Sequence, residues 1–507
     1  GKGRCIASLI LDQWNRGARR HVWISATADL YADACRDLND LGTKIPACNL
    51  AQVKAYGSLD TIGGNREIAK LSPQRDGVLF LTYSMLVSGV SGSAGSTDPQ
   101  HSRFGQVLTW LTHHCRDGEG LICFDEAHKA KNLDANTRAA RLVDELQQCC
   151  PGCAVLYASA TGATEIQHMQ YMMRLGLWGI SENHGPTATP ESGNGAAWAS
   201  TVASAFPDFG SFRSLVSKGG MAAMELVAIQ LKAMGALSCR SLAFEGTTFE
   251  LVNVSLDTER QNQYDASVEI WRDMHNLLQL LEEQGLFSGK QWNEYWAAQQ
   301  RFYKGLVIAA KVPRAVELAK EAIARGESVV MSLWTTNESV INRATASKDS
   351  TTLARCDDGF LSGPELTLEN FIDNHFKAAY SVKAPWAVES AARLRERVRA
   401  LRLPLNPLDE LIDQLGGPSN VAEMSGRSHR RCRDPVTGEV RTECRNSQRK
   451  SVGGKGAGGV VDSVNLLEQR AFQRSEKLVA IITEAASAGI SLHSDRREKP
   501  PPRPRKV

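Results

Sequence analysis

The feature that most constrains the fold of this 507-residue chain is a short apolar run ending in polar residues, which recurs along its first third. The runs lie at residues 21–27, 77–84, 121–126 and 154–161. Helical stretches such as 29–41 and 136–149 fall between them. Apolar runs that alternate with helices are typical of buried parallel strands and predict a doubly wound α/β domain. Ligands bind at the carboxyl ends of the strands in such domains, so we expect chemistry at the polar tips.

Two adjacent carboxylates, Asp125 and Glu126, end the third of these runs. Such a pair suits metal-assisted nucleotide hydrolysis, in which one carboxylate holds Mg²⁺ and the other orients and deprotonates the attacking water. Asp-Glu pairs are also common on exposed helices, but a strand end with His128 two residues later favours the catalytic interpretation. Ser159 and Thr161 end the next run, where motor ATPases use a hydroxyl pair to link the nucleotide and nucleic-acid sites.

The chain opens with Gly1, Lys2, Gly3 and Arg4, directly before a helical stretch. A lysine at a helix N-terminus cradles phosphates through the backbone N–H groups, the helix dipole and its own charge. The full phosphate-loop pattern has glycines upstream and Ser or Thr after the lysine, whereas Gly3 occupies the hydroxyl position here. Residues 1–4 match the phosphate-loop pattern poorly by spacing alone. The assignment is strengthened because they precede Asp125 and Glu126 in the expected order along the chain.

The middle of the chain is predicted to be helical. Residues 181–205 contain a Gly-, Pro-, Ser- and Thr-rich piece that predicts a flexible loop, and 206–310 follow with apolar residues at three- and four-residue steps. The stripe consists of Val268, Trp271, Met274, Leu278, Leu281, Trp292, Trp296, Phe302 and Leu306. It could be a base-stacking platform, but such stripes are more often core, which we favour.

A second α/β pattern begins near residue 311. Strands are predicted at 327–334 and 477–483, with a helix near 407–415 between them. A Gly-rich piece at 427–455 carries nine Lys/Arg against three acids. We predict that Arg427, Arg430, Arg431 and Arg433 lie on or near a nucleic-acid surface, with a solvated loop as the alternative.

Composition excludes some classes of protein. No run of 18 apolar residues occurs, so a membrane span is not expected, and the start of the chain is no signal peptide. The net charge of +3 neither demands nor excludes nucleic acid. Twelve scattered cysteines indicate free thiols in a reducing compartment. Cys149, Cys150 and Cys153 cluster, but a second close pair is missing, which disfavours a zinc site.

The chain resembles the strawberry notch family of superfamily 2 helicase-like proteins. The matching blocks lie at residues 1–4, 124–132, 157–163, 175–179, 407–413 and 475–492. The resemblance implies an α/β fold of two RecA-like P-loop lobes with a helical insertion between them. The expected segments are a first lobe at 1–180, a loop at 181–205, an insertion at 206–310, a second lobe at 311–497 and a tail at 498–507.

The resemblance also implies roles for single residues. The family tolerates glycine after the phosphate-loop lysine, so Gly1, Lys2, Gly3 and Arg4 would bind ATP. Asp125, within a DEAH-type motif, would hold Mg²⁺, and Glu126 would activate water. His128, Ser159 and Thr161 would couple the nucleotide site to the nucleic acid. Strand-end contacts to DNA or RNA are implied for Thr82, Tyr83, Ser84, Thr335 and Thr336. The second-lobe cleft would be lined by Glu484, Ser487, Gly489, Ser491, Asp495, Arg496 and Arg497.

The chain departs from the family pattern after Arg497, where a proline-rich basic tail begins. Because proline runs cannot continue a strand or helix, we interpret the tail as a truncation or a mistaken gene model, with a basic localisation signal as the alternative. An arginine motif that completes the ATP site would then be missing. We therefore expect weak or no ATP hydrolysis from this chain, although the family as a whole is enzymatic.

The resulting hypothesis is an ATP- and Mg²⁺-dependent motor stimulated by DNA or RNA. The resemblance implies a nuclear protein that acts with transcription or chromatin proteins. The alternatives are a catalytically impaired scaffold for protein partners and a mobile-element relative acting on foreign DNA.

Overall fold

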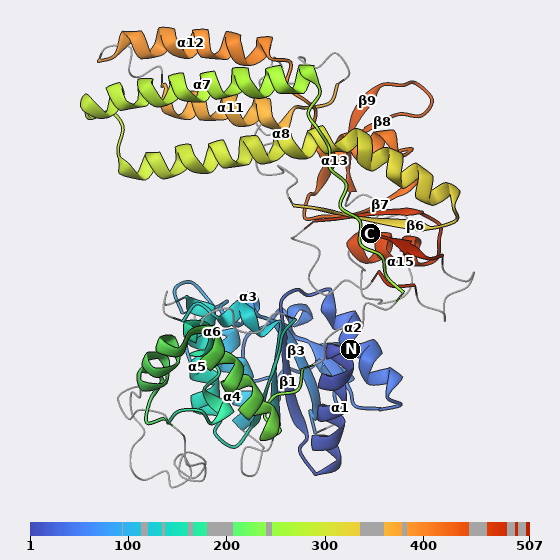
Figure 1. Cartoon of the computed structure of the whole chain (residues 1–507). Coiled ribbons are helices and arrows are strands. Elements are labelled where there is room, and N and C mark those ends of the chain that lie inside the picture. The colour runs from blue at the N-terminus through green and yellow to red at the C-terminus, as the bar shows by residue number, and fades with distance from the viewer. Residues whose placement is uncertain are drawn as a thin grey trace. The chain divides into compact units, whose positions relative to one another are not determined.

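The chain forms two compact units, residues Gly1–Thr247 and Thr248–Val507. The computed structural model, drawn in Figure 1, describes all residues except 73, 94, 113–119, 134–136, 161–165, 180–205, 240–245, 335–358, 378–382, 446–463, 484–491 and 495–502. The predicted loop at 181–205 therefore lies outside the described residues. Within the described part, no helix is long and apolar enough to cross a bilayer.

The first unit is built on a five-stranded parallel sheet in the order β2-β3-β1-β4-β5. The strands are β1 (Arg20–Ser25), β2 (Ala47–Asn49), β3 (Gly77–Thr82), β4 (Gly120–Asp125) and β5 (Ala154–Ala158). Four of them confirm the four predicted runs, whereas the three-residue β2 was not predicted. A strand of that length has too few residues to show a pattern of its own.

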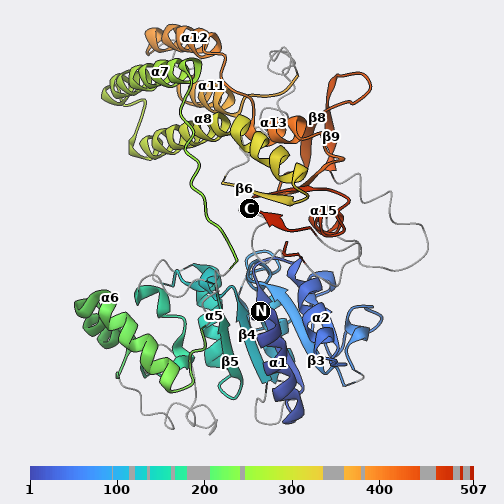
Figure 2. The same cartoon turned by 45° about the vertical axis from the view of Figure 1, so that its right-hand side comes forward.

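Helices cover both faces of this sheet (Figure 2). Trp23, Phe80 and Cys123 pack with α1 (Lys2–Asn15) and α2 (Leu30–Asp40) in one apolar cluster. Their strand neighbours Ile24 and Phe124 pack on the opposite face, because successive strand residues point to opposite sides. That face is covered by α3 (Tyr83–Leu86), α4 (Arg103–Thr112) and α5 (Arg138–Cys149).

Several short elements complete the first unit. Single turns of 3-10 helix lie at Leu50–Gln52, Ile68–Lys70, Ala127–Ala130, Ile166–Met169 and Met173–Leu175. The last helix, α6 (Phe209–Ala233), is kinked at Gly220 and packs around Phe212 and Trp178. The predicted insertion at 206–310 is thus wrong as a single body, because its first helix belongs to the first unit and the rest to the second.

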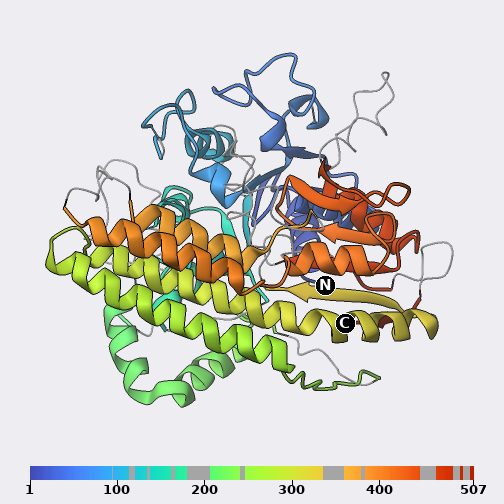
Figure 3. The same ribbon diagram turned by 90° about the horizontal axis from the view of Figure 1, so that it is seen from above.

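The second unit contains a group of long helices, seen from above in Figure 3. These are α7 (Thr258–Glu283), α8 (Gly289–Ala324), α11 (Gly363–His375) and α12 (Pro385–Ala400). Trp271, Met274 and Phe302 are buried between them, which confirms that the aromatic stripe is core. Two members of the stripe, Val268 and Trp296, are instead exposed.

The boundary predicted at 310/311 is also wrong. It falls within α8, which continues unbroken to Ala324. In addition, α11 and α12 were expected in the second lobe but share one apolar core with α7 and α8. The shared core joins residues that are far apart in the sequence, such as Trp271 of α7 and Phe371 of α11. Sequence periodicity predicts single helices but not which helices pack together.

A second parallel sheet, in the order β11-β6-β10-β7, completes the unit. Its strands are β6 (Ser328–Leu333), β7 (Val421–Met424), β10 (Val479–Thr483) and β11 (Arg505–Lys506). It is accompanied by α13 (Pro407–Gln414), α15 (Val464–Gln473) and an antiparallel hairpin of β8 (His429–Arg433) and β9 (Val440–Cys444). The predicted strands at 327–334 and 477–483 and the helix near 407 are confirmed.

The tail contributes a short strand that the sequence did not predict. Arg505 and Lys506 lie past the proline run and pair in parallel with Ser328 and Val329 of β6. The side chain of Arg505 anchors this end of the chain, since its guanidinium lies 4.5 Å from the ring centre of Phe472 and donates to Gln473 Oε1.

Candidate nucleotide site

The start of α1 meets the end of β4. Gly1 is the N-cap of α1, and neither a side-chain cap nor an acidic residue satisfies the first-turn N–H groups. Such a helix start attracts anions, because its N–H groups and dipole point outward. The Lys2 Nζ atom donates a hydrogen bond to Glu126 Oε1 from 124 positions away in the sequence. The structure thus brings together the predicted phosphate-binding lysine and the predicted base.

The carboxylate of Asp125 is buried at the tip of β4. It accepts hydrogen bonds from Ser25 Oγ at 2.7 Å and from the Glu126 backbone N–H at 3.0 Å. Burial raises the pKa of Asp125, and the hydrogen bond from Ser25 opposes that shift. Ser25 was not predicted as a site residue. The available signal was its position at the tip of β1, which neighbours β4 in the sheet.

Glu126 has an unusual backbone conformation. Its φ of 48° and ψ of 47° place it in the left-handed region, which costs a non-glycine residue about 1–3 kcal/mol. The conformation is held by the contact of its N–H with Asp125 and by its carbonyl, which accepts from Lys129 N at 2.9 Å. Strained residues of this kind concentrate at functional sites. The turn directs the Glu126 carboxylate toward Lys2.

His128 connects Glu126 to the end of β5. Its Nδ1 lies 3.1 Å from Ser159 Oγ and 3.4 Å from Glu126 Oε2. Burial lowers the pKa of His128, although the nearby Glu126 carboxylate opposes this shift, and a lowered pKa favours the neutral ring. A neutral imidazole can exchange donor and acceptor roles with the hydroxyl and the carboxylate. Glu126, His128 and Ser159 therefore form a continuous series of polar contacts from the end of β4 to the end of β5.

The other residues of the opening motif face α2. The Arg4 Nη2 atom donates to Asp40 Oδ2 at 2.5 Å on the surface. Gly3 packs so closely that a Cβ added there would lie 2.0 Å from Asp37 Oδ2. A side chain larger than hydrogen at this position would require the Asp37 carboxylate to move.

The predicted nucleic-acid contact at Tyr83 is wrong for its side chain. Tyr83 is buried, and its hydroxyl donates to the Asp125 carbonyl at 2.9 Å. Thr82 is also buried and caps α3 through the Met85 N–H. Ser84 alone of the three is exposed, and its contact with nucleic acid stays a prediction. Tyr83 supports the strand end that carries the paired carboxylates.

Several predicted residues lie outside the described part of the chain. They are Thr161, Thr335, Thr336, Glu484, Ser487, Gly489, Ser491, Asp495, Arg496 and Arg497. Their roles stay predictions.

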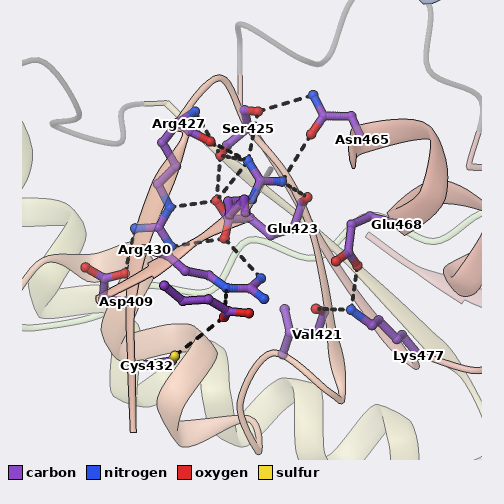
Figure 4. Close-up of polar contacts among 12 residues, drawn as sticks. Asp409, Val421, Glu423, Ser425, Arg427, Arg430, Cys432, Asn465, Glu468 and Lys477 are labelled. Atoms are coloured by element: carbon purple, nitrogen blue, oxygen red, sulfur yellow. Dashed lines mark hydrogen bonds and ion pairs between the residues drawn. The ribbon is translucent and has the colours of Figure 1, made fainter. Parts of the chain in front are cut away.

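The predicted basic surface at 427–433 is wrong in part, because Arg427 and Arg430 are buried. Figure 4 shows both arginines among their polar contacts. Arg427 forms ion pairs with Asp409 at 2.5 Å and with Glu423 at 2.6 Å. Arg430 pairs with Glu443 at 2.9 Å. Arg431 donates to the Gly359 carbonyl, and Arg433 lies 3.4 Å from Asp413. Only these last two keep any access to a ligand, and their contact with nucleic acid stays a prediction.

The residues at the tip of β4 fit a magnesium nucleotide. The open helix start and Lys2 match phosphate oxygens, and a buried carboxylate matches the hard Mg²⁺ ion. Two family models match the chain: P-loop containing NTP hydrolase pore-1 over residues 1–189 and 196–266, and C-terminal domain on Strawberry notch homologue over 406–505. Fold and site together define a P-loop NTPase with helicase-like domains.

The chain belongs to the strawberry notch family. Protein strawberry notch homolog 2 of Mus musculus is 33% identical over 585 residues, covering 98% of this chain and 39% of that protein. Protein FORGETTER 1 of Arabidopsis thaliana is 29% identical over 637 residues, covering 98% and 45%. The chain thus spans less than half of the length of either relative. The family match up to residue 505 also corrects the expectation that the pattern ends at Arg497.

Among solved structures, the Sulfolobus solfataricus SWI2/SNF2 ATPase core in complex with dsDNA is similar with 13% identity and a TM-score of 0.27. The match covers 68% of this chain and 63% of that chain.

Proposed function

We propose that this chain is the motor region of an ATP-driven, nucleic-acid-stimulated enzyme. The observation that carries the proposal is the meeting of Lys2, Asp125 and Glu126 at the start of α1. A cation and two carboxylates at an anion-attracting helix start match the needs of phosphoryl transfer to water, which depends on positioning and charge stabilisation.

In this proposal each residue has one task. Lys2 exchanges its contact with Glu126 for the terminal phosphates of ATP, which frees the Glu126 carboxylate to accept a proton from water. Asp125 would hold Mg²⁺, an ion that neutralises charge on the phosphates. Ser25 keeps the Asp125 carboxylate oriented. His128 would pass the state of Glu126 to the tip of β5 through Ser159.

The family resemblance alone supports a proposal about the substrate, the location and the partners of the enzyme. We infer that the chain acts on DNA or RNA in the nucleus, together with transcription or chromatin proteins. Contacts to nucleic acid would be mainly to the sugar–phosphate backbone, so affinity should fall steeply with salt.

The test is Mg²⁺-dependent ATP hydrolysis by the chain, with and without single-stranded and duplex nucleic acid. The chain alone is expected to hydrolyse ATP weakly, and Glu126→Gln should lower that turnover by a further factor of about 10² to 10⁴. Nucleotide affinity should stay nearly unchanged, because the substitution removes the base and keeps the shape of the side chain. The matched control is Glu225→Gln, at an exposed glutamate of α6, and it should hydrolyse ATP like the wild type. Loss of nucleotide binding together with turnover in Glu126→Gln would contradict the assigned role. A wild type that binds no nucleotide would favour the scaffold alternative.

A further inference from the structure

Trp334 follows β6 directly, at the carboxyl end of the second sheet. It exposes 69% of its surface, more than any other tryptophan in the described part of the chain. Four of the other described tryptophans, including Trp110 and Trp271, are buried in the cores. An indole is among the largest apolar side chains, so leaving one open at a strand tip forgoes substantial hydrophobic stabilisation. Single exposed apolar residues are common, so the surroundings of Trp334 decide its meaning.

A cation lies over the indole. The Lys304 Nζ atom of α8 is 4.5 Å from the ring centre of Trp334. A cation–π contact of this kind holds the ring in one orientation. Because Lys304 and Trp334 are both exposed, the contact leaves ring surface open to a ligand.

Two further cations lie on the same face of α8. Arg301 precedes Lys304 by one turn, and Lys311 follows it by two turns, or about 10 Å along the axis. All three side chains are exposed, and within the described residues none of them forms an ion pair with a carboxylate. They differ in this from Arg427 and Arg430, whose charges are neutralised inside the second unit.

Arg301 also lines a groove between α8 and α11. The groove measures about 570 Å³, a size that accepts a nucleotide-sized ligand. Its walls present the amides Asn293, Asn370 and Asn374 along with Arg301. Among the described residues that line it, the acid Glu294 lies 3.3 Å from His375 Nε2. The groove thus begins one turn of α8 before Lys304, the cation that contacts Trp334.

An exposed aromatic ring in contact with Lys304, on a helix whose two further cations have no carboxylate partner among the described residues, matches the chemistry of single-stranded nucleic acid. Bases stack on the ring, while the cations attract the backbone phosphates. The bases of a duplex already stack on one another, so they offer no free faces along the helix. An acidic peptide would pair with the cations but would have no planar bases to stack on the ring.

We propose that Trp334, with Lys304 and Arg301, forms a base-stacking site for a single strand of DNA or RNA. The inference rests on the proposed function and narrows its substrate to a strand with accessible bases. It also assigns a role in nucleic-acid binding to a residue that precedes the predicted backbone contacts Thr335 and Thr336.

The test measures equilibrium binding of the full chain to labelled oligonucleotides by fluorescence anisotropy. The probes are an oligo-dA strand of about 20 nucleotides, an abasic strand of the same length and a matching duplex. Trp334→Ala should weaken binding of the dA strand about 10- to 100-fold, since one stacked base is lost. Trp334→Phe should keep most of the affinity because it keeps an aromatic face. The abasic strand should bind the wild type and Trp334→Ala equally.

Trp296→Ala is the matched control, because Trp296 is also exposed on α8 but its ring lies beside His275 of α7. It should bind the dA strand like the wild type. Equal loss of affinity for the dA and abasic strands in Trp334→Ala, or no loss at all, would overturn the stacking site while leaving the motor intact. A wild type that binds neither strand nor duplex would overturn the proposed function and the stacking site together.

Discussion

His21 shows how one buried residue can set the response of the whole first unit to pH. It lies within β1, fully buried, and burial lowers its pKa to about 4 from the ordinary 6.5. Between pH 6.5 and 4 the unfolded chain therefore binds a proton that the folded chain does not. The free energy of unfolding should fall by about 3 kcal/mol as the pH falls through this window.

His21→Leu should remove this acid-induced loss, because leucine has no proton to bind. The measurement is urea unfolding of the wild type and the variant at pH 7 and at pH 4.5. The free energy of unfolding should fall less for the variant than for the wild type when the pH is lowered from 7 to 4.5. An equal loss of unfolding free energy in both proteins would show that groups other than His21 determine the loss of stability in acid.

At the scale of residues, the sequence predicts only those members of the nucleotide site that belong to a recognisable sequence pattern. Asp125 and Glu126 are recognisable because they end an apolar run, and ligands bind at strand ends. Ser25 and Tyr83 act through neighbouring strands, so their roles depend on the order β3-β1-β4. Sequence periodicity predicts strands but not the order in which they pair. The partners of the carboxylates were therefore missed although the carboxylates were found.

At the scale of elements, Glu423 of β7 holds the β8–β9 hairpin in place. Its buried carboxylate accepts from Arg427 Nε at 2.6 Å and lies 3.6 Å from Arg445 Nη1. Burial alone would raise the pKa of Glu423, but the guanidinium groups of Arg427 and Arg445 outweigh it and lower the pKa to about 2. The carboxylate stays charged throughout the physiological range and compensates arginines that begin and end the hairpin region.

Glu423→Gln should destabilise the second unit by about 3–5 kcal/mol, because it removes the acidic partner of the buried Arg445 and one of the two acidic partners of the buried Arg427. The control is Asp434→Asn in the same hairpin, where Asp434 pairs with an exposed Arg441 at 3.0 Å. Such a surface pair contributes at most about 1 kcal/mol. Urea unfolding of the two variants and the wild type measures both effects. Similar small losses in both variants would contradict the anchoring role of Glu423.

The same network explains why the arginine-rich piece was misjudged. Counting charges between 427 and 455 detects an excess of cations but not their partners, since Asp409 and Glu423 lie outside that window. A cluster of arginines is equally compatible with a nucleic-acid surface and with an internal ion network until the fold is known. The α8 cations were not singled out, because they are spaced along a helix and interleaved with apolar residues.

At the scale of the molecule, the two units have separate cores. Each described apolar cluster lies wholly within residues 1–247 or wholly within 248–507. Cooperative unfolding follows shared cores, so we expect each unit to unfold in its own transition. The candidate nucleotide site, from Lys2 to Ser159, belongs to the first unit alone.

A nonhydrolysable ATP analogue with Mg²⁺ should therefore raise the Tm of one transition and leave the other unchanged. At a ligand concentration about 100 times the Kd, binding stabilises the folded state by about 2.7 kcal/mol. For a unit of this size that corresponds to a rise of about 5–10 °C. Differential scanning calorimetry measures both transitions in one experiment. Lys2→Ala should abolish the shift by removing the phosphate-binding cation, whereas Lys304→Ala in the second unit should retain it. If one transition includes both units, or the analogue moves both equally, the units are coupled more strongly than their separate cores predict.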